Sequence, residues 1–193
     1  MNIILASASP RRRELLAQMG LTFQIHAADI DEHMDRSLPP DQLVETISAE
    51  KARAAAETAG PDSLILAADT VVAWNGRVLG KPEDEAQAAE MLALLSGRTH
   101  QVYTGFTLRR GEQIETHSQM TLVTFRPLTQ AEIAAYVATG EPMDKAGAYG
   151  IQGLGSLLVE SIQGDYFNVM GLPVCLLGQT LAHFGVFPLQ SKP

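Results

Sequence analysis

Residues 7–16 read SASPRRRELL and predict how the chain begins to fold. The apolar residues 3–5 that precede it predict a short buried strand. Ser9 followed by Pro10 predicts the N-cap and the first residue of a helix, which we expect to end near Gly20. The chain therefore begins with a strand that leads directly into a helix.

Three consecutive arginines, Arg11 to Arg13, fall in the first turn of this predicted helix. The helix dipole already places positive partial charge there, so each cation costs about 0.3–1 kcal/mol unless an anion lies beside it. Backbone N–H groups, the hydroxyls of Ser7 and Ser9 and a guanidinium such as that of Arg12 could together hold a phosphate. The alternative is a solvated basic turn whose charge is compensated by nearby acids.

Composition and charge exclude several classes of protein. With 193 residues, 46% hydrophobic and 19% charged, the chain can bury one sizeable core, as a large domain or as two lobes that share a cleft. The net charge of −8 argues against a nucleic acid polymer as partner, so a phosphate site must be local. No run of about 18 apolar residues and no signal peptide is found, which predicts a cytoplasmic protein without a membrane partner.

Cysteine and histidine usage argues against disulfide and zinc chemistry. Cys175 is the single cysteine, so no intramolecular disulfide can form, and its apolar neighbours predict a packed core thiol. The five histidines do not follow the spacing of a zinc site.

The hydrophobic pattern predicts alternating strands and helices over the rest of the chain. The expected elements are a strand at 22–26, an acidic loop at 27–36, a helix between 39–41 and 60–61, a hairpin over 63–79 with its turn at 75–76, a helix at 83–95, a long hairpin over 99–125, a helix at 129–139, a strand at 157–162 and a last helix from 171–173 to near 185. This mixture of hairpins and crossover helices predicts a mixed, twisted sheet rather than a purely parallel one.

Two charged residues interrupt apolar patterns. Lys51 follows Val44 and Ile47 on one helical face, so its ammonium group must either extend to the rim or meet a carboxylate or phosphate. Asp69 interrupts the apolar run 64–72. A metal ion, a lysine or several hydrogen bonds would explain it, and a magnesium-bound carboxylate that orients water is a common arrangement in phosphate chemistry. The alternative is a capping aspartate at a strand break or bulge.

Two glycine-containing segments differ from known nucleotide motifs. Residues 76–81 are one residue short of a P-loop and Pro82 replaces its Ser/Thr, so we interpret Lys81 as a cation on a rigid turn. Residues 147–155 do not follow the dinucleotide-binding spacing. Gln152 within them offers a donor and an acceptor, which suits either a base edge or the bracing of a loop.

Six motifs follow one another along nearly the whole chain. They are Ser9-Pro10-Arg11-Arg12-x-Glu14-Leu15-Leu16, Glu50-Lys51-Ala52, Ala68-Asp69-Thr70-Val71-Val72, Gly80-Lys81-Pro82, Asp144 to Gly153, and Val169-Met170-Gly171-Leu172-Pro173. Together they resemble the Maf family of nucleoside triphosphate pyrophosphatases. The resemblance implies one Maf-type domain over residues 1–193, with an α/β fold similar to inosine triphosphate pyrophosphatases: a mixed, strongly twisted sheet flanked by helices, with two lobes around a cleft.

The resemblance also implies the chemistry and the residues that perform it. Water would attack the α-phosphate of a nucleoside triphosphate and release a monophosphate and pyrophosphate. Asp69 is similar to the family's general base, acting directly or through a divalent metal, Mg²⁺ or Mn²⁺, which Glu32 and Asp69 would bind. The residues expected to hold the phosphates are Ser7, Ser9, Arg12, Lys51 and Lys81. Arg13 occupies a variable position, and its role is open.

Three positions separate branches of the family, and here they hold Arg11, Thr70 and Gln152. A branch acting on 7-methyl-GTP carries Trp, Gln and Glu at these positions, which suit a cationic methylated guanine. Glutamine suits the uracil or thymine edge, so the resemblance implies a dTTP/UTP pyrophosphatase that cleans nucleotide pools. The alternatives are a pyrophosphatase for inosine or xanthosine triphosphates and a nucleotide-sensing inhibitor of septum formation. The sequence also allows a homodimer.

Overall fold

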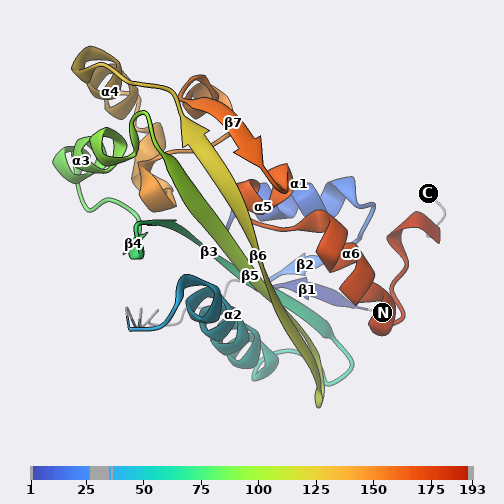
Figure 1. Cartoon of the computed structure of the whole chain (residues 1–193). Coiled ribbons are helices and arrows are strands. Elements are labelled where there is room, and N and C mark those ends of the chain that lie inside the picture. The colour runs from blue at the N-terminus through green and yellow to red at the C-terminus, as the bar shows by residue number, and fades with distance from the viewer. Residues whose placement is uncertain (1, 27–34, 36, 191–193) are drawn as a thin grey trace. The chain divides into compact units, whose positions relative to one another are not determined.

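The computed structural model describes residues 2–26, 35 and 37–190 (Figure 1). The chain divides into two compact units: unit 1 comprises residues 1–69, 104–119 and 171–193, and unit 2 comprises residues 70–103 and 120–170. Three long strands pass from one unit into the other, β3 (Leu64–Trp74), β5 (Thr99–Arg110) and β6 (Gln113–Phe125). This continuity explains why no linker is visible in the sequence.

The strands form a mixed sheet, as predicted. Their order is β2-β1-β3-β5-β6-β7, with β4 (Arg77–Leu79) paired to β3. Strand β1 (Ile3–Leu5) runs parallel to both β2 (Gln24–Ile25) and β3, whereas β4 is antiparallel to β3 and β7 (Val159–Gln163) is antiparallel to β6. The second strand was predicted to span 22–26 and is shorter, because only two residues pair with β1.

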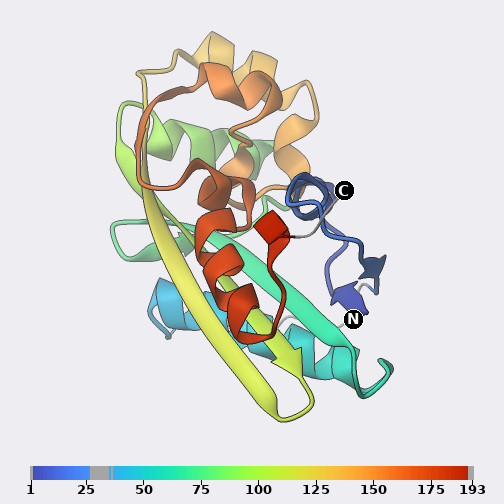
Figure 2. The same cartoon turned by 90° about the vertical axis from the view of Figure 1, so that its right-hand side faces the viewer.

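The helices of unit 1 lie on both faces of its part of the sheet. They are α1 (Pro10–Gln18), α2 (Pro40–Ala56), α6 (Val174–His183) and the 3₁₀ turn η4 (Pro188–Gln190). Thr107 of β5 shares a 2.9 Å hydrogen bond with Ser48 of α2, and Arg110, on the other face of the same strand, donates to the carbonyl of Phe184, the C-cap of α6. Figure 2 shows α6 in front of the strands and α2 behind them.

Small residues let α2 approach the sheet closely. A Cβ at Gly105 would lie 2.6 Å from the backbone of Val44, so only glycine fits there. Beneath the helix, alanines pack against isoleucines of β1 and β3 in a cluster of Ile4, Ala6, Ala52, Ala55, Ile65 and Ala67. Because side chains alternate along a strand, Asp69 lies on the same face of β3 as Ile65 and Ala67, beneath α2.

Unit 2 has its own apolar core. Its helical segments are α3 (Glu85–Leu95), α4 (Gln130–Val137), α5 (Tyr166–Met170) and the 3₁₀ turns η1 (Glu141–Asp144), η2 (Ala146–Ala148) and η3 (Gly153–Leu157). Leu92 of α3 and Ile133 of α4 pack with Val102, Phe125 and Tyr149 in one cluster. Helix α5 was not predicted, because five residues are too few to establish a helical period.

The turns follow their sequence signals, whereas the cysteine does not. Asn75 and Gly76 have positive φ angles of 49° and 75°, as the predicted tight hairpin turn requires. Cys175 was expected to be packed and is exposed. The buried residues of α6 are Leu177, Thr180 and Leu181, and position 175 lies on the opposite side of that helix.

In the part of the chain that the structure describes, no helix combines the length and apolarity required to span a bilayer.

Candidate functional site

The first helix holds Arg12 against the sheet of unit 1. Ser9 is the N-cap of α1 and Pro10 its first residue, as predicted. The guanidinium of Arg12 donates from Nε to the carbonyl of Gly171 and from Nη1 to the carbonyl of Ala68, both at 2.8 Å, and Nη1 also donates to Ser7 Oγ at 3.1 Å. Arg12 is only 9% exposed, so the alternative of a solvated basic turn is wrong for this arginine.

The other two arginines of the turn are less enclosed. Arg11 is half-buried and Arg13 is exposed. The backbone N–H of Ser9 donates to Ser7 Oγ at 3.3 Å, which fixes the backbone at Ser9. The structure therefore brings Ser7, Ser9 and Arg12 together in one hydrogen-bonded turn of unit 1, and their role in binding phosphate stays a prediction.

Lys51 and Asp69 form a buried ion pair in unit 1. Nζ of Lys51 donates to Oδ1 of Asp69 at 2.8 Å, and the two side chains are 11% and 13% exposed. Of the explanations that the sequence left open for these residues, the structure therefore gives a carboxylate to Lys51 and a lysine to Asp69. Asp69 lies inside the continuous strand β3, which excludes a strand break. Arg12 binds the carbonyl of Ala68, one residue earlier, so the backbone at Asp69 is fixed from α1 as well.

Unit 2 holds three of the predicted residues, Thr70, Lys81 and Gln152. Thr70 and Gln152 are half-buried and Lys81 is exposed. The backbone N–H of Gly147 donates to the carbonyl of Gly80 at 3.0 Å, which joins the lysine turn to the glycine-rich segment that leads to Gln152. A Cβ at Gly147 would lie 2.8 Å from a methyl carbon of Val72, so this glycine packs directly on β3, two residues beyond Thr70.

Asp69 has one carboxylate oxygen that could bind a divalent metal. Its Oδ1 is engaged by Lys51, while Oδ2 accepts no hydrogen bond from the described residues. Carboxylate oxygens are ligands for Mg²⁺ and Mn²⁺, and Mg²⁺ is often held by one or two carboxylates together with substrate phosphates and waters. The second predicted ligand, Glu32, lies outside the described residues. No group of three or more His, Cys, Asp or Glu suited to a metal occurs within residues 2–26, 35 and 37–190.

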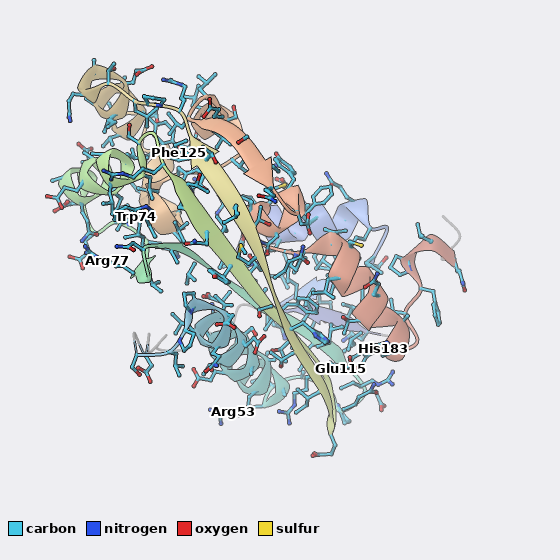
Figure 3. All side chains as sticks on the ribbon, viewed as in Figure 1. Arg53, Trp74, Arg77, Glu115, Phe125 and His183 are labelled. Atoms are coloured by element: carbon cyan, nitrogen blue, oxygen red, sulfur yellow. The ribbon has the colours of Figure 1, made fainter. Side chains whose placement is uncertain are left out.

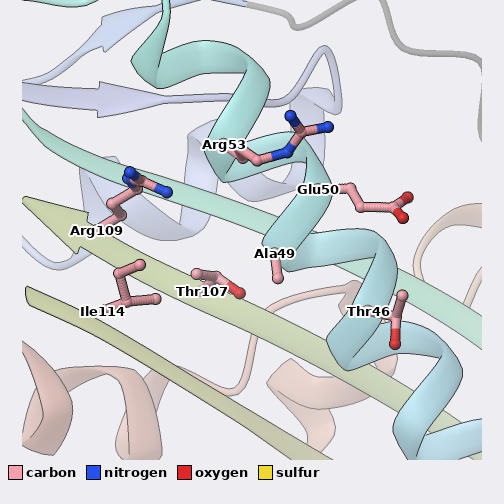
Figure 4. Close-up of a pocket in the computed structure, with 7 residues that line it drawn as sticks. All are labelled: Thr46, Ala49, Glu50, Arg53, Thr107, Arg109 and Ile114. Carbon is pink, nitrogen blue, oxygen red and sulfur yellow. The ribbon is translucent and has the colours of Figure 1, made fainter. Parts of the chain in front are cut away.

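A pocket of about 370 Å³ lies on another part of unit 1, between α2 and the hairpin of β5 and β6 (Figure 4). It is lined by Thr46, Ala49, Glu50, Arg53, Thr107, Arg109 and Ile114. None of the residues that the sequence assigns to phosphate, base or metal lines it, so we do not assign it to the reaction.

Aromatic and carboxylate groups in unit 2 were missed by the sequence analysis. Buried His100 contacts Phe125 edge to face and hydrogen-bonds through Nε2 to the Tyr149 hydroxyl at 2.8 Å. Burial lowers the pKa of His100 to about 4 and raises that of Tyr149, so both are neutral at physiological pH. Glu141 binds backbone N–H groups of the segment that follows Gln152. Neither the His100–Tyr149 contact nor those of Glu141 could be predicted from the hydrophobic pattern, because each joins residues of different elements.

Relatives of known name were found over nearly the whole chain. A protein of Moorella thermoacetica is 60% identical over 188 residues, covering 95% of each chain, and one of Symbiobacterium thermophilum is 50% identical over 183 residues, covering 95% of this chain and 94% of that protein. Both are named dTTP/UTP pyrophosphatase.

A comparison with solved structures and a comparison with family models agree with the names of these relatives. A solved HAM1 protein from Coxiella burnetii superimposes with a TM-score of 0.51 at 16% identity, covering 95% of this chain and 99% of that one, which supports the predicted fold class. The sequence model of the family described as Maf-like protein matches residues 2–184. With the six motifs in order and the buried Lys51–Asp69 pair in place, the chain belongs to the Maf family.

Proposed function

We propose that this protein hydrolyses dTTP and UTP to the monophosphate and pyrophosphate, and so removes these nucleotides from the cellular pool. The observation that carries the proposal is the buried Lys51–Asp69 pair, in which one carboxylate oxygen is fixed and the other accepts no hydrogen bond from the described residues. The names of relatives up to 60% identical support the choice of substrate. A cytoplasmic location and a homodimer stay predictions.

Asp69 acts as the general base in the proposed reaction. Its Oδ2 is the atom proposed to activate the water that attacks the α-phosphorus, by taking its proton directly or by holding a divalent metal that would lower the pKa of that water, while Lys51 holds Oδ1 and thereby fixes the plane of the carboxylate. The new bond joins the water oxygen to the α-phosphorus, the bond from that phosphorus to the bridging oxygen breaks, and pyrophosphate leaves. A divalent metal held by Asp69, with Glu32 as the second proposed ligand, would neutralise charge on the phosphates.

The remaining residues bind the substrate. A nucleoside triphosphate brings about four negative charges to an acidic protein, so cations must be concentrated where it binds. We assign phosphate binding to Ser7, Ser9, Arg12, Lys51 and Lys81. Arg12 is already held by two carbonyls and a hydroxyl, so its guanidinium needs little ordering when the substrate arrives.

Base recognition is assigned to Arg11, Thr70 and Gln152. The carboxamide of Gln152 offers one donor and one acceptor, which match the neighbouring carbonyl and N–H of a uracil or thymine edge. A carboxylate at this position could only accept, which suits a guanine instead.

The experiment is a nucleotide panel with separation of all phosphate products. We expect dTTP and UTP, with Mg²⁺ or Mn²⁺, to yield the monophosphate and pyrophosphate. A nucleoside diphosphate and free phosphate would contradict the reaction type. Faster turnover of inosine or xanthosine triphosphate would favour a purine-directed enzyme, and binding without turnover of any nucleotide would favour a sensor.

A further inference from the structure

The carboxylate of Glu141 binds the backbone of the loop that carries Gln152. Oε1 of Glu141 accepts from the backbone N–H of Gly155 at 2.9 Å and from the hydroxyl of Tyr136 at 2.9 Å, and Oε2 accepts from the N–H of Leu154 at 3.0 Å. The hydroxyl of Tyr136 also accepts from the N–H of Gly150 at 3.3 Å. Two side chains therefore bind the backbone on both sides of position 152, and all these residues belong to unit 2.

Close packing leaves the loop little freedom to move. Gly153 has a φ of +68°, and a Cβ there would lie 2.8 Å from Oε2 of Glu141. A Cβ at Gly155 would lie 2.1 Å from the carbonyl oxygen of Gly150 and 2.7 Å from the Tyr136 hydroxyl. The glycines thus let the backbone fold directly onto the two side chains that hold it.

Glu141 is itself held in place. Nζ of Lys145 donates to its backbone carbonyl at 2.6 Å, and its backbone N–H donates to the Thr139 hydroxyl at 3.1 Å. Burial raises the pKa of the Glu141 carboxyl, but the N–H donors of Gly155 and Leu154, the Tyr136 hydroxyl and the charge of Lys145 together more than offset this, and the net pKa lies below its usual range. The group is therefore a carboxylate at neutral pH and can accept from all three donors.

We propose that Glu141 is a positioning residue for base recognition, whose carboxylate fixes the Gly150–Gly155 loop so that Gln152 presents its carboxamide in one orientation. This inference rests on the proposed reading of the base by Gln152. Gln152 provides the donor and the acceptor, and Glu141 determines where they lie. Tyr136 extends the same hydrogen-bond network to Gly150.

The test compares Glu141→Gln with wild type on UTP and CTP, whose edges exchange one donor and one acceptor. Glutamine offers one acceptor oxygen where the carboxylate offers two, so at least one loop N–H would face an NH₂ group. We expect the UTP-to-CTP ratio of kcat/KM to fall about 10-fold, through a higher KM for UTP and with kcat within a few-fold of wild type. Hydrogen exchange at the amides of Leu154 and Gly155 should become faster.

Two further variants provide a matched control and a second, independent change to the same hydrogen-bond network. Glu160→Gln makes the same chemical change at an exposed position of β7 in the same unit, and it should leave both the ratio and the exchange rates unchanged. Tyr136→Phe keeps the buried ring and removes the hydroxyl, so it should lower the ratio in the same direction by a smaller factor even if Glu141→Gln does not fold.

Gln152→Ala separates the two proposals. If it changes the UTP-to-CTP ratio while Glu141→Gln and Tyr136→Phe behave like Glu160→Gln, the positioning role is wrong and the reading by Gln152 stands. A uniform loss of activity on both nucleotides in Glu141→Gln would likewise show a merely structural role. If Gln152→Ala leaves the ratio unchanged, the base reading itself is wrong and the inference falls with it.

Discussion

Removing one member of the Lys51–Asp69 pair should lower the free energy of unfolding of unit 1, by an amount that follows from how deeply the pair is buried. Lys51→Met keeps the apolar stem and removes the ammonium that lies 2.8 Å from Asp69 Oδ1. Breaking a buried pair from one side costs about 3–5 kcal/mol, and because Asp69 retains 13% exposure we expect about 2–3 kcal/mol. For a chain of this size, that loss lowers Tm by about 4–12 °C.

The complementary change separates stability from catalysis. Asp69→Asn keeps the shape and an oxygen acceptor for Lys51 but removes the proposed base, so kcat should fall at least about 100-fold with folding retained. The double variant Lys51→Met/Asp69→Asn has neither charge. Its loss of stability should therefore be smaller than the sum of the single losses by about 1–3 kcal/mol, yet it should remain inactive.

The assay combines thermal unfolding with steady-state kinetics on UTP. Asp62→Asn, at an exposed position of the same unit, is the matched control and should change neither quantity. Activity of Asp69→Asn within a few-fold of wild type would refute its role as base and make Glu32 the next candidate. Strict additivity in the double variant would refute the coupling that the 2.8 Å contact implies.

Three further outcomes are expected. Arg11→Trp/Thr70→Gln/Gln152→Glu should shift the ratio of kcat/KM from dTTP towards 7-methyl-GTP, and an unchanged preference in a variant that still turns over would place base reading elsewhere. Chelation of divalent metal should abolish hydrolysis, and added Mg²⁺ or Mn²⁺ should restore it; full activity in excess chelator would contradict the metal requirement. Burial lowers the pKa of His100 from 6.5 to about 4, so the unfolded state binds more protons in this range, and stability should fall by about 3 kcal/mol as pH falls from 6.5 to 4. His100→Gln should lessen this dependence in pH-resolved denaturant titrations.

Local signals predicted most of the fold, because they act over a few residues. Ser9 and Pro10 define the start of α1 through capping and a fixed φ, and Asn75-Gly76 adopts the positive φ angles that its hairpin needs. The apolar patterns of β3, β5 and β6 gave their positions to within a few residues, although they carry no sign of a division into two units.

Long-range contacts were beyond the sequence. Lys51 and Asp69 each broke an apolar pattern and were identified on that basis, but that they are each other's partners depends on the packing of α2 on β3. Cys175 was misjudged because apolar neighbours in sequence do not decide which side of α6 faces the core.

Surface contacts were equally hidden from the pattern. Glu115 accepts from His183, 68 residues away, at 2.9 Å (Figure 3), and the histidine holds the pKa of that carboxyl below its usual range. The hydrogen bonds from Leu154 and Gly155 to Glu141 lie in segments with no regular hydrophobic pattern, so the sequence gives no sign of them. The acidic loop with Glu32 lies outside the described residues, so its metal-binding role stays a prediction.

The oxygen that water contributes to the products identifies the phosphorus atom that is attacked. Hydrolysis of UTP in ¹⁸O-labelled water with Mg²⁺ should place one labelled oxygen in UMP and none in pyrophosphate, because Asp69 is proposed to direct water to the α-phosphorus. Label in the pyrophosphate would mean attack at the β-phosphorus, and label in free phosphate beside UDP would mean attack at the γ-phosphorus. Either result would contradict attack at the α-phosphorus.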